Sequence, residues 1–279
     1  MSGDPHRAAL GRRSALRGRA RRAVFLCYHS VTDDGPPYLS LSPATLESQL
    51  RILASAGYSS GTRSDLDELA AGRGVGRRAF LTFDDGFADT ADTAMPILRE
   101  AGFAGMAFLL PAHLDAGAPL DWPDVAGEAK RRPQLMRSVD WAMAEQLAGA
   151  GWAIGSHGIS HRRMPNLSDE ELTEELLDSR RRLADRFGAC DMLAYPFGDW
   201  DERVAAAAAA AGYEFAFSLP FGEQKEATRL SIPRVMVDDR DVSWRFRAKL
   251  TRFGREALFS PLRPVVRKML RRRPHSHAE

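Results

Sequence analysis

The feature that most constrains this 279-residue chain is an alternation of short apolar runs with helical patterns from residue 23 onward. Each run has the length of a buried strand, and the stretches between the runs carry helical spacing and capping residues. Strands that alternate with helices pair in parallel through right-handed crossovers. We therefore predict an α/β protein with a parallel sheet, either open or closed into a barrel. The predicted strands are 23–28, 79–83, 105–110, 152–155, 192–195, 214–218 and 231–237.

Capping residues mark where the helices begin. Ser42 followed by a proline predicts a helix that runs to about residue 56, and Ser168 with Glu171 forms a capping box before a long charged helix. A third helix is expected near 89–101, and Ser138 is expected to open a fourth. In parallel α/β folds the chemistry lies on loops at the carboxyl ends of strands, so polar motifs are sought there.

The charge is distributed unevenly, although the net charge is only +2. Residues 1–22 carry seven arginines and one acid, and residues 245–273 carry eleven basic residues and one acid. The central part, 23–244, carries 21 basic and 34 acidic residues, which argues against a nucleic-acid binder despite the basic pI. We divide the chain into a basic N-terminal extension (1–22, expected to be disordered), a central domain (23–240) and a basic amphipathic C-terminal extension (241–279).

The first chemical motif is the adjacent pair Asp84 and Asp85, at the end of the strand 79–83. Two carboxylates at the end of a buried strand need a cation, hydrogen bonds or a shifted pKa. Neighbours on an extended chain point in opposite directions, so the two can serve different roles. An Asp-Gly turn with a helix cap is the structural alternative.

The second motif is His157 and His161, which follow the strand 152–155. Two histidines four residues apart lie on one face of a helical turn and can bind one metal ion. Together with one carboxylate they form a set that suits a divalent cation able to activate water or polarise a carbonyl. The other carboxylate is then free to act as general base.

Two further motifs follow predicted strands. Tyr195-Pro196-Phe197-Gly198 can aim a backbone amide into the site, or can simply end a strand. His29 follows the first strand, where a single histidine is more often structural.

These motifs, in this order, resemble the polysaccharide deacetylases (carbohydrate esterase family four, the NodB-homology domain) over roughly residues 23–240. The resemblance implies a distorted (β/α)7 barrel. It assigns Asp84 as general base, Asp85, His157 and His161 as metal ligands, and the amide of Phe197 as an oxyanion donor. The expected cofactor is one divalent ion, with zinc first and cobalt, nickel, iron or manganese as alternatives.

The chain departs from the commonest family pattern at two places. No Leu-x-His motif follows residue 198, whereas Tyr28-His29 is similar to the N-terminal Tyr-His element of a branch that includes biofilm-polysaccharide deacetylases. We therefore assign His29 as general acid. Ala194 stands where an arginine usually steadies the base. Arg234 either replaces that arginine, by reaching Asp84 from the last strand, or makes a surface ion pair.

The remaining expectations concern substrate, partners and location. Trp122 and Tyr195 are candidates for sugar contacts, although Trp122 could equally belong to the core. The basic segment 245–262 is expected to cover the barrel, and 263–273 is left as a patch for an anionic membrane or a partner. With no readable signal peptide and no apolar run of the ~18 residues that a membrane span needs, we expect a protein of the cytoplasm or of the cytoplasmic membrane face.

By this resemblance, the expected activity is removal of acetyl groups, N-acetyl preferred, from a polysaccharide or glycan precursor. The expected context is an exopolysaccharide of the cell envelope. Two alternatives are an O-acetyl esterase on a glycan and a non-catalytic scaffold that binds glycan or membrane with the same fold.

Overall fold

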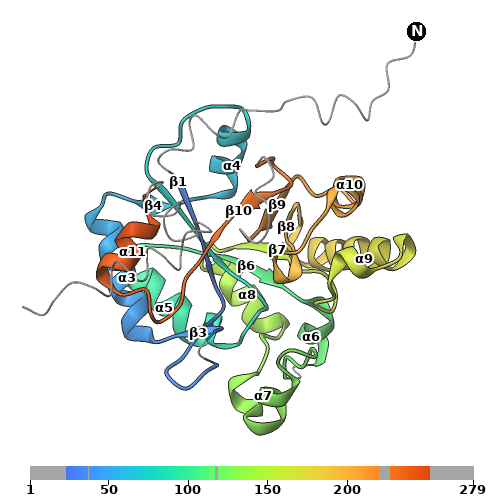
Figure 1. Cartoon of the computed structure of the whole chain (residues 1–279), viewed down its shortest axis with the longest axis horizontal. Helices are drawn as coiled ribbons and strands as arrows, with labels where there is room; N and C mark the ends of the chain where they lie inside the picture. The colour runs from blue at the N-terminus through green and yellow to red at the C-terminus, as the bar shows by residue number, and fades with distance from the viewer. Residues whose placement is uncertain (1–22, 37, 117–118, 220–226, 252–279) are drawn as a thin grey trace, which may run out of the picture.

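The computed structural model of the chain describes residues 23–36, 38–116, 119–219 and 227–251. A mostly parallel sheet runs through the middle of this region, and helices surround it (Figure 1). Its strands are β1 (Ala23–Tyr28), β4 (Ser59–Ser60), β5 (Arg78–Phe83), β6 (Met106–Leu109), β7 (Ala153–Ser156), β8 (Met192–Ala194), β9 (Phe215–Ser218), β10 (Ile232–Pro233) and β11 (Val235–Met236). A separate pair, β2 (Ser30–Val31) and β3 (Ser40–Leu41), lies beside it.

The sheet is nearly closed into a barrel, because the last predicted strand is divided into β10 and β11, which lie at its two edges. The strand order is β10-β9-β8-β7-β6-β5-β1-β11, so its two edge strands are neighbours in the chain. We expected one strand over 231–237, but β10 pairs with β9 while β11 pairs with β1, and Arg234 alone lies between them. The segment 232–236 therefore pairs with both edges of the sheet: its first part with β9 and its second part with β1. The predicted distorted (β/α)7 barrel is otherwise confirmed.

The helices begin largely where their caps predict. The Ser42 side chain accepts the amide of Thr45 at the start of α3, and the Ser168 capping box opens α9. Ser138 does not open a helix: its hydroxyl donates to the His113 carbonyl, and Asp140 caps α8 instead. The described helices and helical turns are α3 (Pro43–Ser55), α4 (Arg63–Ala70), η2 (Thr90–Ala94), α5 (Met95–Glu100), α6 (Pro111–Ala116), α7 (Ala126–Arg131), η3 (Pro133–Leu135), α8 (Trp141–Gly149), η4 (Met164–Asn166), α9 (Asp169–Phe187), η5 (Pro196–Gly198), α10 (Glu202–Ala210) and α11 (Ser243–Lys249).

Helix α11 packs against α3 on the outside of the barrel (Figure 1). Phe246 is fully buried there, and the ammonium group of Lys249 pairs with the buried carboxylate of Asp241. The described part of the basic C-terminal segment therefore covers the barrel. The rest of both predicted extensions, 1–22 and 252–279, lies outside the described residues.

The part of the chain that the structure describes has no helix with the length and apolarity that crossing a membrane requires.

Candidate active site

The residues predicted to carry chemistry meet at the carboxyl ends of the strands. His29 follows β1, Asp84 and Asp85 follow β5, and His157 follows β7. A cavity of about 200 Å³ opens at this end of the barrel. It is lined by His29, Tyr38, Leu39, Asp84, Asp85, Trp122, Asp124, Val125, His157, His161, Arg163, Phe197, Gly198 and Leu219.

Three of these side chains converge as a candidate metal centre. Asp85 Oδ1 lies 3.1 Å from His157 Nε2 and 3.2 Å from His161 Nε2. All three residues are buried, and Asp85 Oδ1 has no hydrogen-bond partner among the described residues. Two neutral imidazole nitrogens and a carboxylate oxygen are all acceptors, so a cation between them makes this close approach favourable. The donor set fits the divalent ion predicted from the sequence.

Two contacts outside this group hold the histidines in place. His157 Nδ1 lies 2.7 Å from the Ala194 carbonyl, which fixes the tautomer that leaves Nε2 free for a metal. Glu175 on α9 accepts hydrogen bonds from the amides of Ile159 and Ser160 at 2.6 and 3.2 Å, and from the Ser160 hydroxyl at 2.5 Å. A buried carboxylate thus fixes the loop between the two histidines.

Asp84 has a different environment, although it is next to Asp85 in the chain. Arg234 donates from Nη1 to Oδ1 and from Nη2 to Oδ2, both at 2.6 Å, and also from Nη1 to the Thr82 hydroxyl. The Arg234 side chain is fully buried, with Phe108 and Phe217 beneath the guanidinium. The ion pair of Arg234 is therefore a buried one with Asp84 and not one on the surface.

The pKa shifts of the two aspartates favour their ionised forms, whereas those of the two histidines run in opposite directions. Burial alone would raise the pKa of both aspartates, but Arg234 lowers that of Asp84, and the two histidines lower that of Asp85 further. Burial opposes protonation of His157, yet the two carboxylates raise its pKa above the ordinary value. The pKa of His161 is lowered, because burial outweighs the attraction of Asp85. Both carboxylates are therefore ionised at neutral pH.

Backbone strain is concentrated at this site. The described residues include four non-glycine residues with positive φ, and three of them are Asp85 (70°), His161 (63°) and Phe197 (60°). Such a conformation costs about 1–3 kcal/mol and persists only where surrounding contacts enforce it. The strain marks these three positions as functional candidates independently of their chemistry.

The aromatic residues divide into cavity wall and core. The ring centroids of Trp122 and Phe197 lie 4.0 Å and 4.5 Å from that of His161, and both residues line the cavity. Tyr195, in contrast, is fully buried, and its hydroxyl donates to the Leu230 carbonyl at 2.9 Å. Because Tyr195 does not line the cavity, we correct the expectation that its side chain contacts the sugar.

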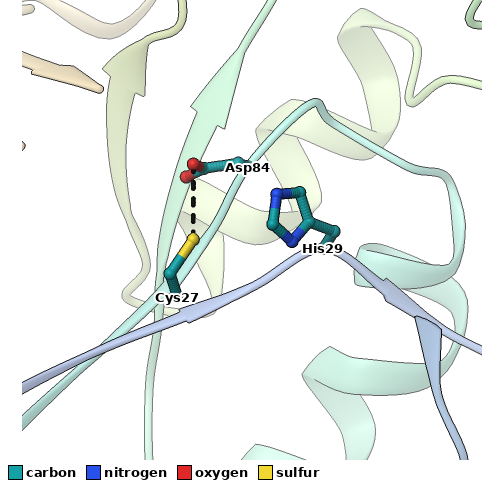
Figure 2. Close-up of side chains that lie close together, drawn as sticks. All are labelled: Cys27, His29 and Asp84. Atoms are coloured by element: carbon teal, nitrogen blue, oxygen red, sulfur yellow. Dashed lines mark hydrogen bonds between the residues drawn. The ribbon is translucent and has the colours of Figure 1, made fainter. Parts of the chain in front are cut away.

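Three residues at the site had no predicted role. Cys27, on β1, donates its thiol to Asp84 Oδ2 at 3.5 Å (Figure 2). Asp89 accepts from the Ser30 hydroxyl at 2.6 Å and from the Val31 amide at 3.0 Å, directly after His29. Glu175 had a weak signal, since its position in α9 falls on the same face as the buried Leu172, Leu176 and Ser179.

Comparison with known proteins decides the family. The sequence profile described as "Polysaccharide deacetylase" matches residues 71–216, more than half of the chain. The chain belongs to the polysaccharide deacetylase family. Membership of this family supports a deacetylase activity on acetylated polysaccharide. The chain is also 22% identical over 217 residues to YxkH of Bacillus subtilis, whose name places it among polysaccharide deacetylases; the match covers 76% of this chain and 70% of the relative.

Solved structures share the deacetylase fold. The Streptococcus pyogenes deacetylase PplD, solved in complex with acetate, matches with a TM-score of 0.67 at 18% identity, over 78% of this chain and 94% of that one. IcaB from Ammonifex degensii matches with a TM-score of 0.67 at 18% identity, over 84% and 97% of the two chains. At these identities the likeness establishes the barrel.

Proposed function

We propose that this polysaccharide deacetylase is a metal-dependent hydrolase that removes N-acetyl groups from a polysaccharide or glycan precursor. One observation carries the proposal: adjacent carboxylates at the floor of one cavity are separated into two environments. Asp85 faces two histidine nitrogens, and Asp84 is held by a guanidinium. Metal-assisted hydrolysis of an acetamide uses a cation site and a fixed base, and this division can supply both.

Asp85, His157 and His161 would hold the divalent ion. Zinc is our first assignment, because two imidazoles and a carboxylate suit it, although the same donors accept cobalt, nickel, iron or manganese. Such an ion acts as a Lewis acid toward the acetyl carbonyl and a water molecule.

The chain's own residues perform the proton transfers. Asp84 accepts the proton of the attacking water, because Arg234 keeps it ionised and fixes its orientation. His29, which lines the same cavity, delivers a proton to the nitrogen of the leaving amine. In the turn at Phe197, the Gly198 and Asp199 amides bond within the turn. The amide of Phe197 is left to donate to the oxygen on which negative charge develops.

Replacement of His29 tests the acid and separates amide from ester hydrolysis. An amine leaves poorly without a proton, whereas an activated ester has a good leaving group. We expect His29→Ala to lower acetate release from N-acetylated glucosamine oligomers by about 10²-fold or more, and to leave hydrolysis of an activated acetate ester nearly unchanged. Equal losses on both substrates, or no loss on the amide, would contradict the assignment. A wild-type enzyme active only on O-acetyl groups would favour the esterase alternative.

The cytoplasmic location, the exopolysaccharide substrate and a membrane contact of the basic C-terminal segment remain predictions. Acetate release with purified oligomers, and vesicle binding by the full chain, would test the last two separately.

A further inference from the structure

The buried thiol of Cys27 contacts Asp84, the base of the proposed reaction. Cys27 is the fifth residue of β1 and is fully buried, and its Sγ–H donates to Asp84 Oδ2. His29 follows two residues later, so its side chain leaves the backbone on the same side as that of Cys27. Figure 2 shows the three side chains close together, with the Cys27 thiol facing the Asp84 carboxylate along their hydrogen bond and the His29 imidazole beside them.

The three side chains form a second group of potential metal ligands, distinct from Asp85, His157 and His161. Cys27 Sγ, one carboxylate oxygen of Asp84 and one ring nitrogen of His29 all lie within 4.8 Å of one another. Sulfur is a soft ligand, so this group prefers zinc or cadmium over magnesium or calcium. We propose that Cys27, Asp84 and His29 form a second, inhibitory site for a thiophilic divalent cation.

Binding at this site is an exchange of a proton for a cation. The S–H bond of Cys27 breaks, a sulfur–metal bond forms, and the proton leaves to solvent, so no oxidant or reductant is needed. Asp84 Oδ2 loses the thiol as a hydrogen-bond donor and ligates the cation in its place. Asp84 keeps its two bonds to Arg234, since a carboxylate oxygen has two lone pairs.

The surrounding charges make this site weaker than the first. The Arg234 guanidinium contacts both Asp84 oxygens and repels a cation, and an ion at Asp85 would add to that repulsion. Only the thiolate adds compensating negative charge. The first site therefore fills first, and the second fills when cation is in excess.

Occupation of the second site would stop the reaction, a consequence that rests on the proposed function. Asp84 and His29 are the residues that we assign as base and acid. A cation on both removes the proton acceptor and the proton donor together, while the first ion stays in place.

The test is a cadmium titration of the full-length, untagged protein already loaded with one zinc per chain. The first site has only nitrogen and oxygen ligands, so a thiolate-to-cadmium charge-transfer band in the ultraviolet reports the second site alone. We expect a second bound equivalent together with this band, and no band with magnesium. Cys27→Ser should abolish the band and weaken binding of the second equivalent at least tenfold, with the zinc retained.

Cys190 supplies the matched control, because it is the other buried free cysteine in the described chain. Cys190→Ser should keep the band. Excess cadmium should lower acetate release at least tenfold in wild type and in Cys190→Ser, but less than twofold in Cys27→Ser. Each protein is compared with its own activity when it holds one zinc per chain and no cadmium.

Absence of the band in the zinc-loaded wild type, or a band that disappears with Cys190→Ser and survives Cys27→Ser, would overturn the proposal. If Cys27→Ser does not retain zinc or its thermal unfolding transition, Cys27→Ala replaces it under the same criteria. Band and stoichiometry do not depend on turnover, so a protein that binds the second cation but releases no acetate would refute the proposed function and leave the site established.

Discussion

Asp84 and Asp85 are neighbours in the chain, yet the fold gives them opposite surroundings. Asp85 lies among imidazole nitrogens, with one oxygen that no hydrogen bond satisfies among the described residues. Asp84 lies on a guanidinium that satisfies both of its oxygens, and a thiol adds a third contact. The first environment is complete only with a cation, whereas the second already contains one.

The difference teaches how one strand end can hold two carboxylates with two roles. Asp85 has a φ of 70°, so the chain is no longer extended there, and the two side chains reach different partners. Asp85 then depends on a loop 72 residues further along the chain, and Asp84 depends on the residue that joins the two edges of the barrel, 150 positions away. The base is therefore tied to barrel closure, and the cation site to the loop after β7.

The largest expected effect is on the base side. Asp84→Asn keeps the shape of the side chain but cannot accept the proton of water. We expect acetate release to fall by about 10³-fold. Steady-state kinetics on an N-acetylated oligomer measures this, and circular dichroism checks that the variant is folded. A loss of less than tenfold would mean that Asp84 is not the base.

Removal of the Arg234 guanidinium, which holds Asp84, should lower stability as well as activity. Arg234→Met leaves the Asp84 carboxylate buried without a partner, which is expected to lower the free energy of unfolding by about 3–5 kcal/mol. The pKa of Asp84 should rise, because Arg234 is what lowers it. The acidic limb of the pH profile of kcat/KM should then move to higher pH, whereas Arg234→Lys should restore part of both. Urea unfolding and the pH profile measure the two effects, and an unchanged profile would contradict the coupling.

Asp89, a partly buried carboxylate near His29, shows what happens when neutral donors take the place of a guanidinium. Burial raises its pKa to about 6 despite the hydrogen bonds from Ser30 and Val31. In the unfolded chain, the Asp89 carboxyl ionises near its ordinary pKa. The folded wild type therefore loses stability as the pH rises from about 4 to about 6, and Asp89→Asn does not. The variant's stability relative to wild type should rise by about 3 kcal/mol over this range. Urea unfolding at a series of pH values tests this, and a difference that does not depend on pH would contradict it.

The smallest expected effect lies on the cation side. Glu175→Gln removes the charge that accepts the Ile159 and Ser160 donors and loosens the loop that carries both histidines. Metal affinity should fall by about 10- to 100-fold. Competition with a chelator measures it, and Glu174→Gln, one residue earlier on the exposed side of α9, is the matched control. Equal affinities in both variants would show that Glu175 does not support the site.

The cation side could be predicted from the sequence because its signals are local. Asp85 follows a buried strand directly, and His157 and His161 belong to one short motif, so strand ends and spacing were enough to place them together. The same is true of the helices with strong caps, such as α3 and α9.

The contacts around Asp84 were harder to predict because they depend on packing between distant segments. The sequence placed Arg234 near the last strand but left its partner open, since a side chain's direction depends on how that strand splits. Cys27 and Glu175 gave only the pattern of buried positions, which does not separate a core residue from one that contacts the site. The ring of Tyr195 belongs to the core and its hydroxyl donates to the Leu230 carbonyl, and the residue order of a turn does not reveal this.

The most direct test of the division is the bound metal in a pair of isosteric variants at adjacent positions. Divalent ions per chain are measured by elemental analysis in untagged wild type, Asp84→Asn and Asp85→Asn after incubation with one equivalent of zinc and removal of unbound ion. The account predicts about one ion in wild type and in Asp84→Asn, and none in Asp85→Asn, with both variants inactive. Equal retention in both variants, or equal loss from both, would contradict it.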